Sequence, residues 1–296
     1  MCGIIGYLGK KQSAPILLEG LSRLEYRGYD SAGVCLLTNG QLEVIKKSGP
    51  IKVLTEAMSQ QQIDSQVGIA HTRWATHGRP NEINAHPHCD CQGKIAVVHN
   101  GIIENFQALK TLLEKEGHKI ISETDSEVIA HLIEKFYTGD LESAVVESIK
   151  CLEGTFGLAV MHAGENKIVA ARRGSPLILG VGQDETFIAS DASAILEYTQ
   201  QVIYLQDNEI AVIADSGYIL KNIKGEEVDS KITEIKWTIA EIEKGGFDHF
   251  MLKEIFEQPK TIANTLRGRI NNGEIKFSIN LHPKKIDRII ITACGT

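Results

Sequence analysis

Apolar residues recur along the first half of the chain with two periods, about two and about 3.6 residues, which are those of strands and helices. Helical spacing is clear in residues 13–28, where isoleucine and leucine share one face, Ser13 can act as a cap and Gly28 stops the helix. Asn39-Gly40, between two strand-like runs, predicts a β-hairpin. The same reasoning predicts helices over residues 53–62, 104–117, 124–137 and 141–154, and apolar strands over residues 4–8, 67–73 and 94–102.

A run of short strands fills the chain between Phe156 and about Ile235, where glycine, asparagine and aspartate turns separate apolar segments. Adjacent strands, with the helices gathered elsewhere, are typical of antiparallel sheets and not of a parallel βαβ sheet. We therefore expect an α+β fold in which antiparallel sheets stack on each other and helices lie outside them.

The pattern changes after about residue 238. Gly245-Gly246 interrupts it, an amphipathic helix is predicted up to Pro259, and another helical stretch ends near Gly268. Residues 286–296 form an apolar run of the kind that a buried parallel strand shows, followed by a turn of small residues. Such a strand needs neighbours, so we expect it to begin a second domain that has been cut away.

Composition and charge exclude some classes of function. The 296 residues are 43% hydrophobic and 23% charged, which is ordinary for a globular protein, and the net charge of −7 argues against a nucleic-acid or anionic-membrane partner. No apolar run approaches the roughly 18 residues that a membrane span needs, and the N-terminus does not resemble a signal peptide. With six cysteines and no export signal, we expect a cytoplasmic protein with reduced thiols.

The cysteine at position 2 stands directly before the first strand. If Met1 is removed, Cys2 carries a thiol and a free α-amine on one residue. An α-amine has a pKa of about 7.7–8.0 and a thiol one of about 8.5, so a neutral amine is available at neutral pH to take the thiol proton. A cysteine at position 2 is weak evidence alone, but this pairing is a nucleophile with its own base.

A polar segment follows the strand over residues 67–73. Arg73 offers a fork for a carboxylate, and Thr76 and His77 offer further polar contacts. Trp74 offers a large, rigid apolar surface. The segment could equally be a surface loop in which Trp74 is only a buried anchor.

A second polar segment follows the strand over residues 94–102. The side-chain amide of Asn100 beside the N–H of Gly101 would suit an oxyanion hole for acyl transfer, although an Asn-Gly turn is common without function. Farther along, Thr124 or Asp125 could cap the next helix, or the acidic residue could receive an ammonium group.

A histidine- and cysteine-rich segment invites a metal interpretation. Its possible zinc ligands are His86, His88, Cys89 and Cys91. Their spacing fits no standard structural zinc pattern, and the sequence offers no obvious second pair of ligands. We expect no physiological metal, and no cofactor.

Taken together, several segments are far more specific than any one alone. The segments MCGIIGYLG, LEYRGYDSAG, AHTRWATHG, NAHPH, VVHNGIIEN and SETDSEVIAHL resemble the glutaminase domain of the glutamine–fructose-6-phosphate aminotransferases (isomerizing), also called glucosamine-6-phosphate synthases. The resemblance runs through nearly the whole chain. It implies a class II glutamine amidotransferase with the N-terminal nucleophile hydrolase fold, a four-layer αββα sandwich.

The same resemblance implies an organisation of the chain. Residues 1–237 would form the glutaminase domain, residues 238–285 an interdomain linker with helices, and residues 286–296 the first strand of a truncated sugar-isomerase domain.

The resemblance also implies roles for single residues. Cys2, exposed by removal of Met1, would attack the side-chain amide of glutamine and form a glutamyl thioester. Asn100 and Gly101 would hold the oxyanion. The residues implied to bind substrate or to support the site are Arg73, Trp74 (as part of a lid), Thr76, His77 and Asp125 for binding, and Arg27 and His86 as supports.

The implied partner is glutamine, with fructose 6-phosphate reached only through the missing domain. The full-length enzyme would be a homodimer and this chain a monomer or weak dimer. Two alternatives stay open: the glutaminase domain of another class II enzyme, and a non-catalytic module that senses glutamine.

Overall fold

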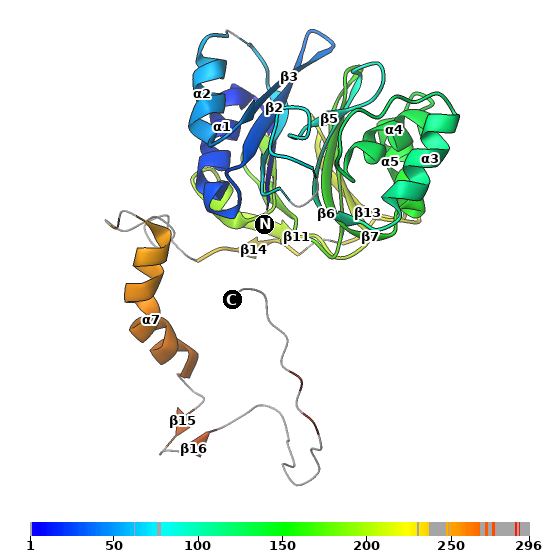
Figure 1. Cartoon of the computed structure of the whole chain (residues 1–296). Helices are drawn as coiled ribbons and strands as arrows, with labels where there is room; N and C mark the ends of the chain where they lie inside the picture. Colours follow the sequence, from blue (N-terminus) through cyan, green and yellow to red (C-terminus); the bar gives the residue numbers. More distant parts are fainter. Residues whose placement is uncertain are drawn as a thin grey trace. The chain divides into compact units, whose positions relative to one another are not determined.

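The computed structural model describes residues 2–61, 63–75, 78–229, 231–236, 247, 249–266, 270–271, 274–275, 288 and 290. The chain divides into two compact units, one up to residue 242 and the other from residue 243. All described residues expected at the site lie in the first unit, shown in blue to yellow in Figure 1.

One sheet of the first unit has eight antiparallel strands in the order β14-β11-β9-β10-β1-β4-β2-β3. Its central strands, β1 and β4, are almost entirely buried, which explains their continuous apolar sequences. The strands are β1 (Gly3–Gly9), β2 (Ser31–Thr38), β3 (Gln41–Ser48), β4 (Val67–Arg73), β9 (Ile178–Val181), β10 (Glu185–Ala189), β11 (Gln201–Tyr204) and β14 (Thr233–Glu234).

The other sheet has six antiparallel strands in the order β13-β12-β8-β7-β6-β5. The long strands β6 and β7 pair antiparallel, with Ile95 opposite His162 at one end and Ile103 opposite Gly154 at the other. The strands are β5 (His88–Cys89), β6 (Ile95–Ile103), β7 (Gly154–His162), β8 (Glu165–Arg173), β12 (Glu209–Ala214) and β13 (Gly217–Asn222).

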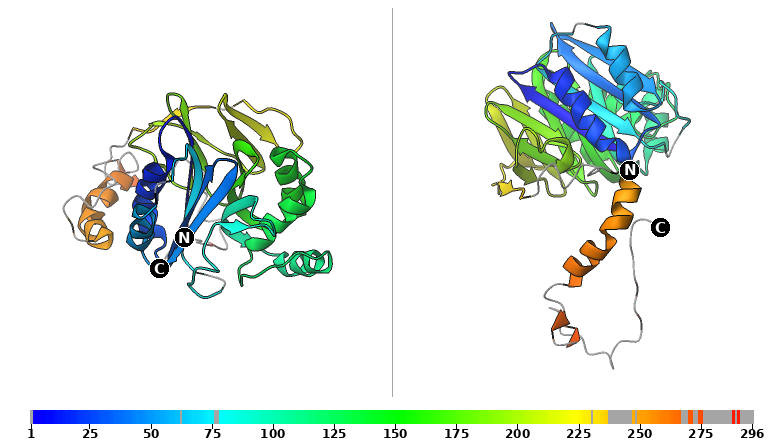
Figure 2. Two further views of the ribbon diagram at one scale, coloured as in Figure 1. Left: turned by 90° about the horizontal axis from the view of Figure 1, so that it is seen from above. Right: turned by 90° about the vertical axis from the view of Figure 1, so that its left-hand side faces the viewer.

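The two sheets face each other and carry helices on their outer faces (Figures 1 and 2). Helices α1 (Ser13–Leu24) and α2 (Ile51–Ser59) pack on the eight-stranded sheet, and α3 (Phe106–Lys115), α4 (Glu127–Phe136) and α5 (Leu141–Cys151) on the six-stranded one. A third apolar cluster, with Ile4, Val98 and Ile168, fills the space between the sheets. The predicted α+β fold with antiparallel sheets is confirmed, and its layers run helix, sheet, sheet, helix.

The first helix departs from the prediction at both ends. The cap position is Gln12, and Ser13 is already helical; its hydroxyl donates to the carbonyl of Ser65, just before β4, instead of capping the helix. The predicted end near Gly28 is a short 3₁₀ helix, η1 (Glu25–Arg27), that continues from α1. A second 3₁₀ turn, η2 (Ala192–Ala194), follows β10.

The second unit contains α7 (Phe250–Leu266), β15 (Ile270–Asn271) and β16 (Glu274–Ile275). The prediction that a helix stops at Pro259 is wrong, because α7 contains this proline. A proline inside a helix removes one backbone hydrogen bond at a cost of about 3 kcal/mol. The Gly245-Gly246 break and nearly all of the run 286–296 lie outside the described residues, so the domain boundaries stay predictions.

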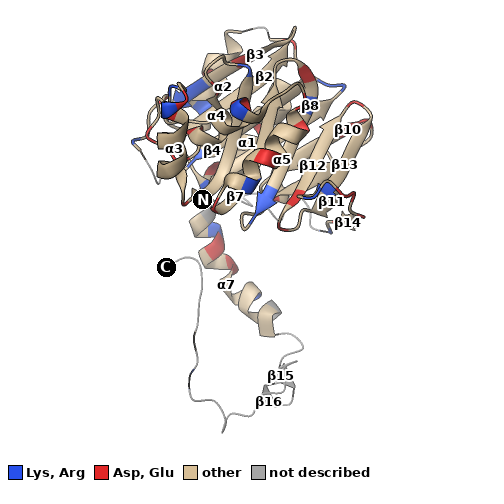
Figure 3. Cartoon of the chain, turned by 90° about the vertical axis from the view of Figure 1, so that its right-hand side faces the viewer, with Lys and Arg blue, Asp and Glu red and all other residues tan. Residues whose placement is uncertain are grey.

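In the view of Figure 3, positions of basic and acidic residues are interspersed along the ribbon of the first unit. Within the described part of the chain, no helix has both the length and the apolar character to cross a membrane.

Candidate functional site

Cys2 directly precedes the central strand β1. The pairing of Gly3 with Thr72 brings Cys2 beside Arg73, at the end of the neighbouring strand β4. The Cys2 sulfur accepts a hydrogen bond from the Trp74 N–H at 3.3 Å and lies 3.6 Å from the Trp74 carbonyl. Burial raises the pKa of the Cys2 thiol, although the Trp74 N–H and nearby cations oppose the shift. At neutral pH this sulfur is therefore a thiol that needs a base before it can attack.

Asn100, on β6, reaches Cys2 across the two sheets. Its side-chain N–H group donates to the Cys2 carbonyl at 3.2 Å, and its side-chain oxygen lies 3.0 Å from Nε2 of His71. The same Nε2 lies 3.1 Å from the carbonyl of His99. Both neighbours of Nε2 are acceptors, so Nε2 carries the proton and donates. His71 thereby fixes the amide of Asn100 with its nitrogen toward Cys2.

His71 remains neutral in this position. Burial lowers its pKa to about 3, in spite of the hydrogen bond with Asn100. His71 is not among the residues that the sequence pointed to. The signal was available in its position two residues before Arg73, which places both on the same face of β4.

Gly101, the other predicted oxyanion residue, has a backbone conformation that requires glycine. Its φ is +140°, and a Cβ placed there would lie 2.1 Å from the carbonyl oxygen of Thr155 on β7. This close approach explains why a glycine follows Asn100 within a paired strand.

The segment after β4 is held by the guanidinium of Arg73. This side chain is buried and donates to the carbonyls of Gly78 and Arg79 at 3.3 Å each. Trp74 is 44% exposed, and its ring packs edge-on against Tyr29 with centroids 5.6 Å apart. The interpretation of Trp74 as a buried anchor is therefore wrong.

Thr76 and His77 lie outside the described residues. The backbone directly before them is held by Asp30, to which the sequence did not point. A carboxylate oxygen of Asp30 accepts the N–H of Ala75 at 2.8 Å.

Asp125 is buried and does not cap the helix that follows it. The cap position of α4 is Ser126, and no side-chain hydrogen bond caps this helix end, so the prediction of Thr124 or Asp125 as the cap is wrong. The Asp125 carboxylate instead accepts the N–H of Ile103, at the end of β6, at 2.8 Å. Because β6 also carries Asn100, the acidic group is tied to the strand of the predicted oxyanion hole.

The two predicted supporting residues lie on different sides of the site. Arg27 is nearly buried and forms an ion pair with Asp191 at 3.0 Å, from where its charge acts on the Cys2 thiol. His86 lies in a stack of rings, with centroids 4.1 Å from His71 and 4.5 Å from His88. Neither ring nitrogen of His86 has a hydrogen-bond partner, and burial followed by the neighbouring His71 lowers its pKa well below the usual range.

The possible zinc ligands of the segment 86–91 do not converge on one point. His86 and His88 point into the ring stack, and Nε2 of His88 pairs with the Thr124 hydroxyl at 3.1 Å. The Cys91 sulfur contacts two other histidines instead, Nδ1 of His118 at 3.7 Å and Nδ1 of His131 at 3.5 Å. A separate groove of about 660 Å³ along β9 and β11, lined by Tyr198 and Glu234 among others, contains none of the residues predicted at the glutamine site.

Known proteins are similar to this chain in sequence. Residues 71–197 match the family described as "Glutamine amidotransferase domain". The whole chain is 51% identical, over 298 residues, to glutamine–fructose-6-phosphate aminotransferase (isomerizing) from Aquifex aeolicus and covers 50% of that protein. It is 49% identical, over 300 residues, to the enzyme of the same name from Thermococcus kodakarensis and covers 49% of it. The chain thus spans about half the length of the curated relatives it matches.

Solved structures share the fold. The glutamine phosphoribosylpyrophosphate amidotransferase of B. subtilis superposes with a TM-score of 0.66 at 26% identity, over 75% of this chain and 49% of that one. A glutamine aminotransferase class-II domain protein from Silicibacter pomeroyi, at 17% identity, has a TM-score of 0.53 over 75% of this chain and 99% of its own, which supports the fold alone.

The two antiparallel sheets, with a cysteine at the start of one central strand, are therefore those of a class II glutamine amidotransferase domain. Over its whole length the chain is similar to about half of the glutamine–fructose-6-phosphate aminotransferases (isomerizing).

Proposed function

We propose that this chain hydrolyses glutamine to glutamate and ammonia through Cys2. The observation that carries the proposal is the amide of Asn100, which His71 orients so that its nitrogen faces Cys2. A donor held in this way before substrate arrives stabilises the charge of a tetrahedral intermediate without reorganisation.

The reaction begins with proton transfer from the Cys2 thiol to its own α-amine, directly or through water, once Met1 has been removed. Because burial raises the thiol pKa, an adjacent base is required and the amine is the nearest one. The sulfur then forms a bond to the side-chain amide carbon of glutamine. The carbonyl oxygen becomes an oxyanion, which accepts the second N–H of the Asn100 amide and the N–H of Gly101.

Collapse of this intermediate breaks the carbon–nitrogen bond. The protonated α-amine returns its proton to the leaving nitrogen, so ammonia departs and Cys2 is left as a glutamyl thioester. Water then adds to the thioester carbonyl, with the same amine as base and the same oxyanion donors. The carbon–sulfur bond breaks, the sulfur regains a proton, and glutamate is released.

Substrate binding is assigned to residues around the loop after β4. Arg73 would pair with the α-carboxylate of glutamine, because its present hydrogen bonds to the Gly78 and Arg79 carbonyls are long and a charged acceptor competes well with them. Thr76 and His77 would assist. Asp125 would receive the α-ammonium, and the exposed Trp74 would move with the loop to cover bound glutamine.

In the longer proteins of this family, the released ammonia would be used to make glucosamine 6-phosphate from fructose 6-phosphate. We propose the same role for the protein to which this glutaminase half belongs. We further propose that residues 286–296 begin its sugar-isomerase domain, that the full-length protein is a cytoplasmic homodimer, and that Arg27 and His86 support the glutaminase site.

The test is ammonia release from glutamine by chain whose intact mass shows that Met1 is absent. Cys2→Ala is expected to abolish turnover, whereas Cys151→Ser, at a partly exposed thiol on another element, is expected to leave it unchanged. Covalent labelling of Cys2 by an electrophilic glutamine analogue provides a second measurement. A mature Cys2 that neither turns over glutamine nor accepts the label would favour a glutamine-sensing module.

A further inference from the structure

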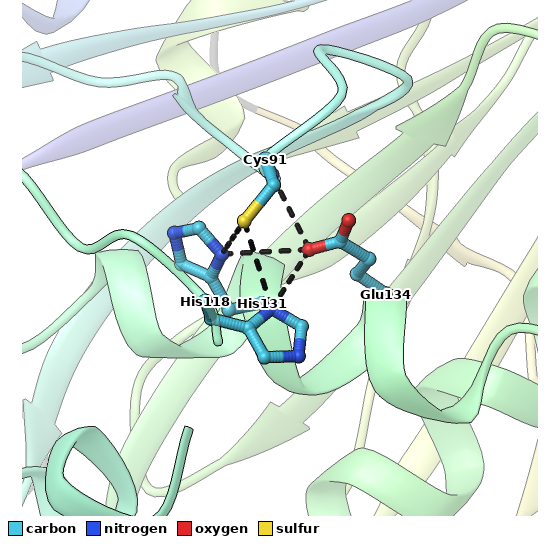
Figure 4. Close-up of side chains that lie close together, drawn as sticks. All are labelled: Cys91, His118, His131 and Glu134. Carbon is cyan, nitrogen blue, oxygen red and sulfur yellow. Dashed lines mark hydrogen bonds and ion pairs between the residues drawn. The ribbon is translucent and has the colours of Figure 1, made fainter. Parts of the chain in front are cut away.

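Four potential metal ligands outside the glutamine site converge on one point. They are the sulfur of Cys91, Nδ1 of His118, Nδ1 of His131 and a carboxylate oxygen of Glu134, and all lie within 4.8 Å of one another. Figure 4 shows the four side chains pointing toward a common centre. From this geometry we infer a structural zinc site, which we call the α4 site.

The ligands come from three segments that are separate in sequence. Cys91 lies in the turn between β5 and β6, and His118 lies just after α3. His131 and Glu134 are one turn apart on α4, so they project from the same face of that helix. A metal here would fasten the β5–β6 turn and the α3–α4 connection to α4.

Four distances between the ligand atoms are close to the edges of a tetrahedral zinc site. Zinc bonds of about 2.3 Å to sulfur and about 2.0–2.1 Å to nitrogen and oxygen imply edges of roughly 3.6 Å for S···N and roughly 3.3 Å for N···O. The Cys91 sulfur lies 3.7 Å from His118 Nδ1 and 3.5 Å from His131 Nδ1. Oε2 of Glu134 lies 2.9 Å from His118 Nδ1 and 3.5 Å from His131 Nδ1.

A hydrogen-bonded cluster without metal accounts for only part of this geometry. The 2.9 Å contact of His118 with Glu134 is an ordinary hydrogen bond or ion pair. The 3.5 Å separation of His131 Nδ1 from the same oxygen is too long for a good hydrogen bond, but it fits a ligand edge. One thiolate and one carboxylate would also neutralise a divalent cation.

The surroundings match those of a metal centre. The N–H of Lys119 approaches the Cys91 sulfur at 3.5 Å, and the N–H of Cys91 donates to Glu134 at 3.3 Å. On the far side of the His131 ring, Nε2 faces a carboxylate oxygen of Glu127 at 3.5 Å. Metal-bound histidines commonly have such an outer carboxylate, which orients the ring.

The ligand types select the metal. A thiolate, two imidazoles and a carboxylate suit zinc, and four protein ligands leave no open position for substrate, so the site is structural. Binding would replace the Cys91 S–H bond with a sulfur–zinc bond and release the proton to solvent.

The first experiment titrates chelator-treated chain with Zn²⁺ against a chromophoric competitor. We expect one zinc per chain, a higher melting temperature with zinc, and an affinity more than about 100-fold lower in Cys91→Ser, since loss of an outer partner alone costs about 10–100-fold. Glu127→Gln is expected to lower the zinc affinity by only about 10–100-fold. Cys151→Ser is the matched thiol control and should bind like the unaltered chain.

The second experiment replaces zinc with Co²⁺, whose spectrum reports a bound thiolate and tetrahedral geometry. The thiolate charge-transfer band should vanish in Cys91→Ser and His118→Gln, which must retain the circular dichroism of the original chain, and should persist in Cys2→Ser. The inference is overturned by absence of stoichiometric binding, by binding that Cys91→Ser leaves intact, or by binding that is lost in Cys2→Ser, which would place the metal at the N-terminal thiol.

Discussion

At the scale of single residues, the arrangement depends on groups that do not touch substrate. His71 acts through Asn100, because it holds the side-chain oxygen of that amide and so determines which way the nitrogen points. We regard it as a positioning residue.

We predict that His71→Phe lowers kcat for glutamine hydrolysis by about 10- to 100-fold and changes KM by less than about threefold, since loss of a complete oxyanion donor costs about 10²–10³ in kcat. His71→Gln retains an N–H donor and should recover part of the loss. Steady-state kinetics measure both constants. His162→Phe, at a buried ring stacked on Tyr137, is the control.

A purely structural role for His71 would give another pattern. Loss of protein stability without specific loss of kcat, or equal failure of the phenylalanine and glutamine variants, would contradict the prediction.

The buried histidines also predict an effect of pH on stability. The pKa values of His71, His86, His88 and His99 are all lowered by burial, that of His71 to about 3. These rings are neutral in the folded chain, whereas in the unfolded chain they bind protons below about pH 6.5. The unfolded state therefore gains protons as the pH falls, and the free energy of unfolding falls by about 1.4 kcal/mol per pH unit for each histidine.

Urea unfolding between pH 8 and pH 5 measures this dependence, because carboxylates titrate mainly below about pH 4.5. His86→Leu should make the free energy of unfolding depend less steeply on pH, by about 1.4 kcal/mol per pH unit, the contribution of one proton. An unchanged slope in His86→Leu would show that this ring is not a neutral buried group.

At the scale of elements, the site lies where the ends of β1, β4 and β6 meet. The backbone of β6 therefore contributes to the site as well as its side chains, through the N–H of Gly101. We predict that Gly101→Ala lowers glutaminase activity by at least about 100-fold, because the new Cβ would displace the Thr155 carbonyl and with it the oxyanion N–H. Gly139→Ala is a matched control, since its φ of +108° is equally unfavourable but its Cβ would meet no atom within 4 Å.

Activity is measured by ammonia release and stability by thermal unfolding. If both glycine variants lose activity equally, the steric argument at Thr155 fails.

The elements of the site were largely predictable from the sequence, because Cys2 directly precedes one apolar strand and two others, β4 and β6, run directly into polar segments. What the sequence could not reveal depends on contacts between elements. His71 meets Asn100 only when the two sheets stack, and Asp125 meets Ile103 only when the start of α4 reaches the end of β6. Local patterns do not encode such contacts, and for the same reason the spacing of Cys91 gave no hint of its neighbours on α4.

At the scale of the whole molecule, the site belongs to one compact unit of the chain and the last 54 residues, 243–296, belong to the other. The three apolar clusters and every described site residue belong to the unit that ends at residue 242. This unit also contains all the strands of the two large sheets.

We predict that a chain shortened to residues 1–242 keeps its kcat for glutamine within about twofold and its melting temperature within a few degrees. The physical reason is that truncation removes no strand of the two large sheets, none of the three apolar clusters and no described hydrogen bond of the site. Ammonia release and calorimetry compare the shortened chain with the full one, after mass spectrometry has shown that both lack Met1. A shortened chain that folds with an unchanged melting temperature but hydrolyses glutamine much more slowly would show that residues 243–296 order the loop after β4.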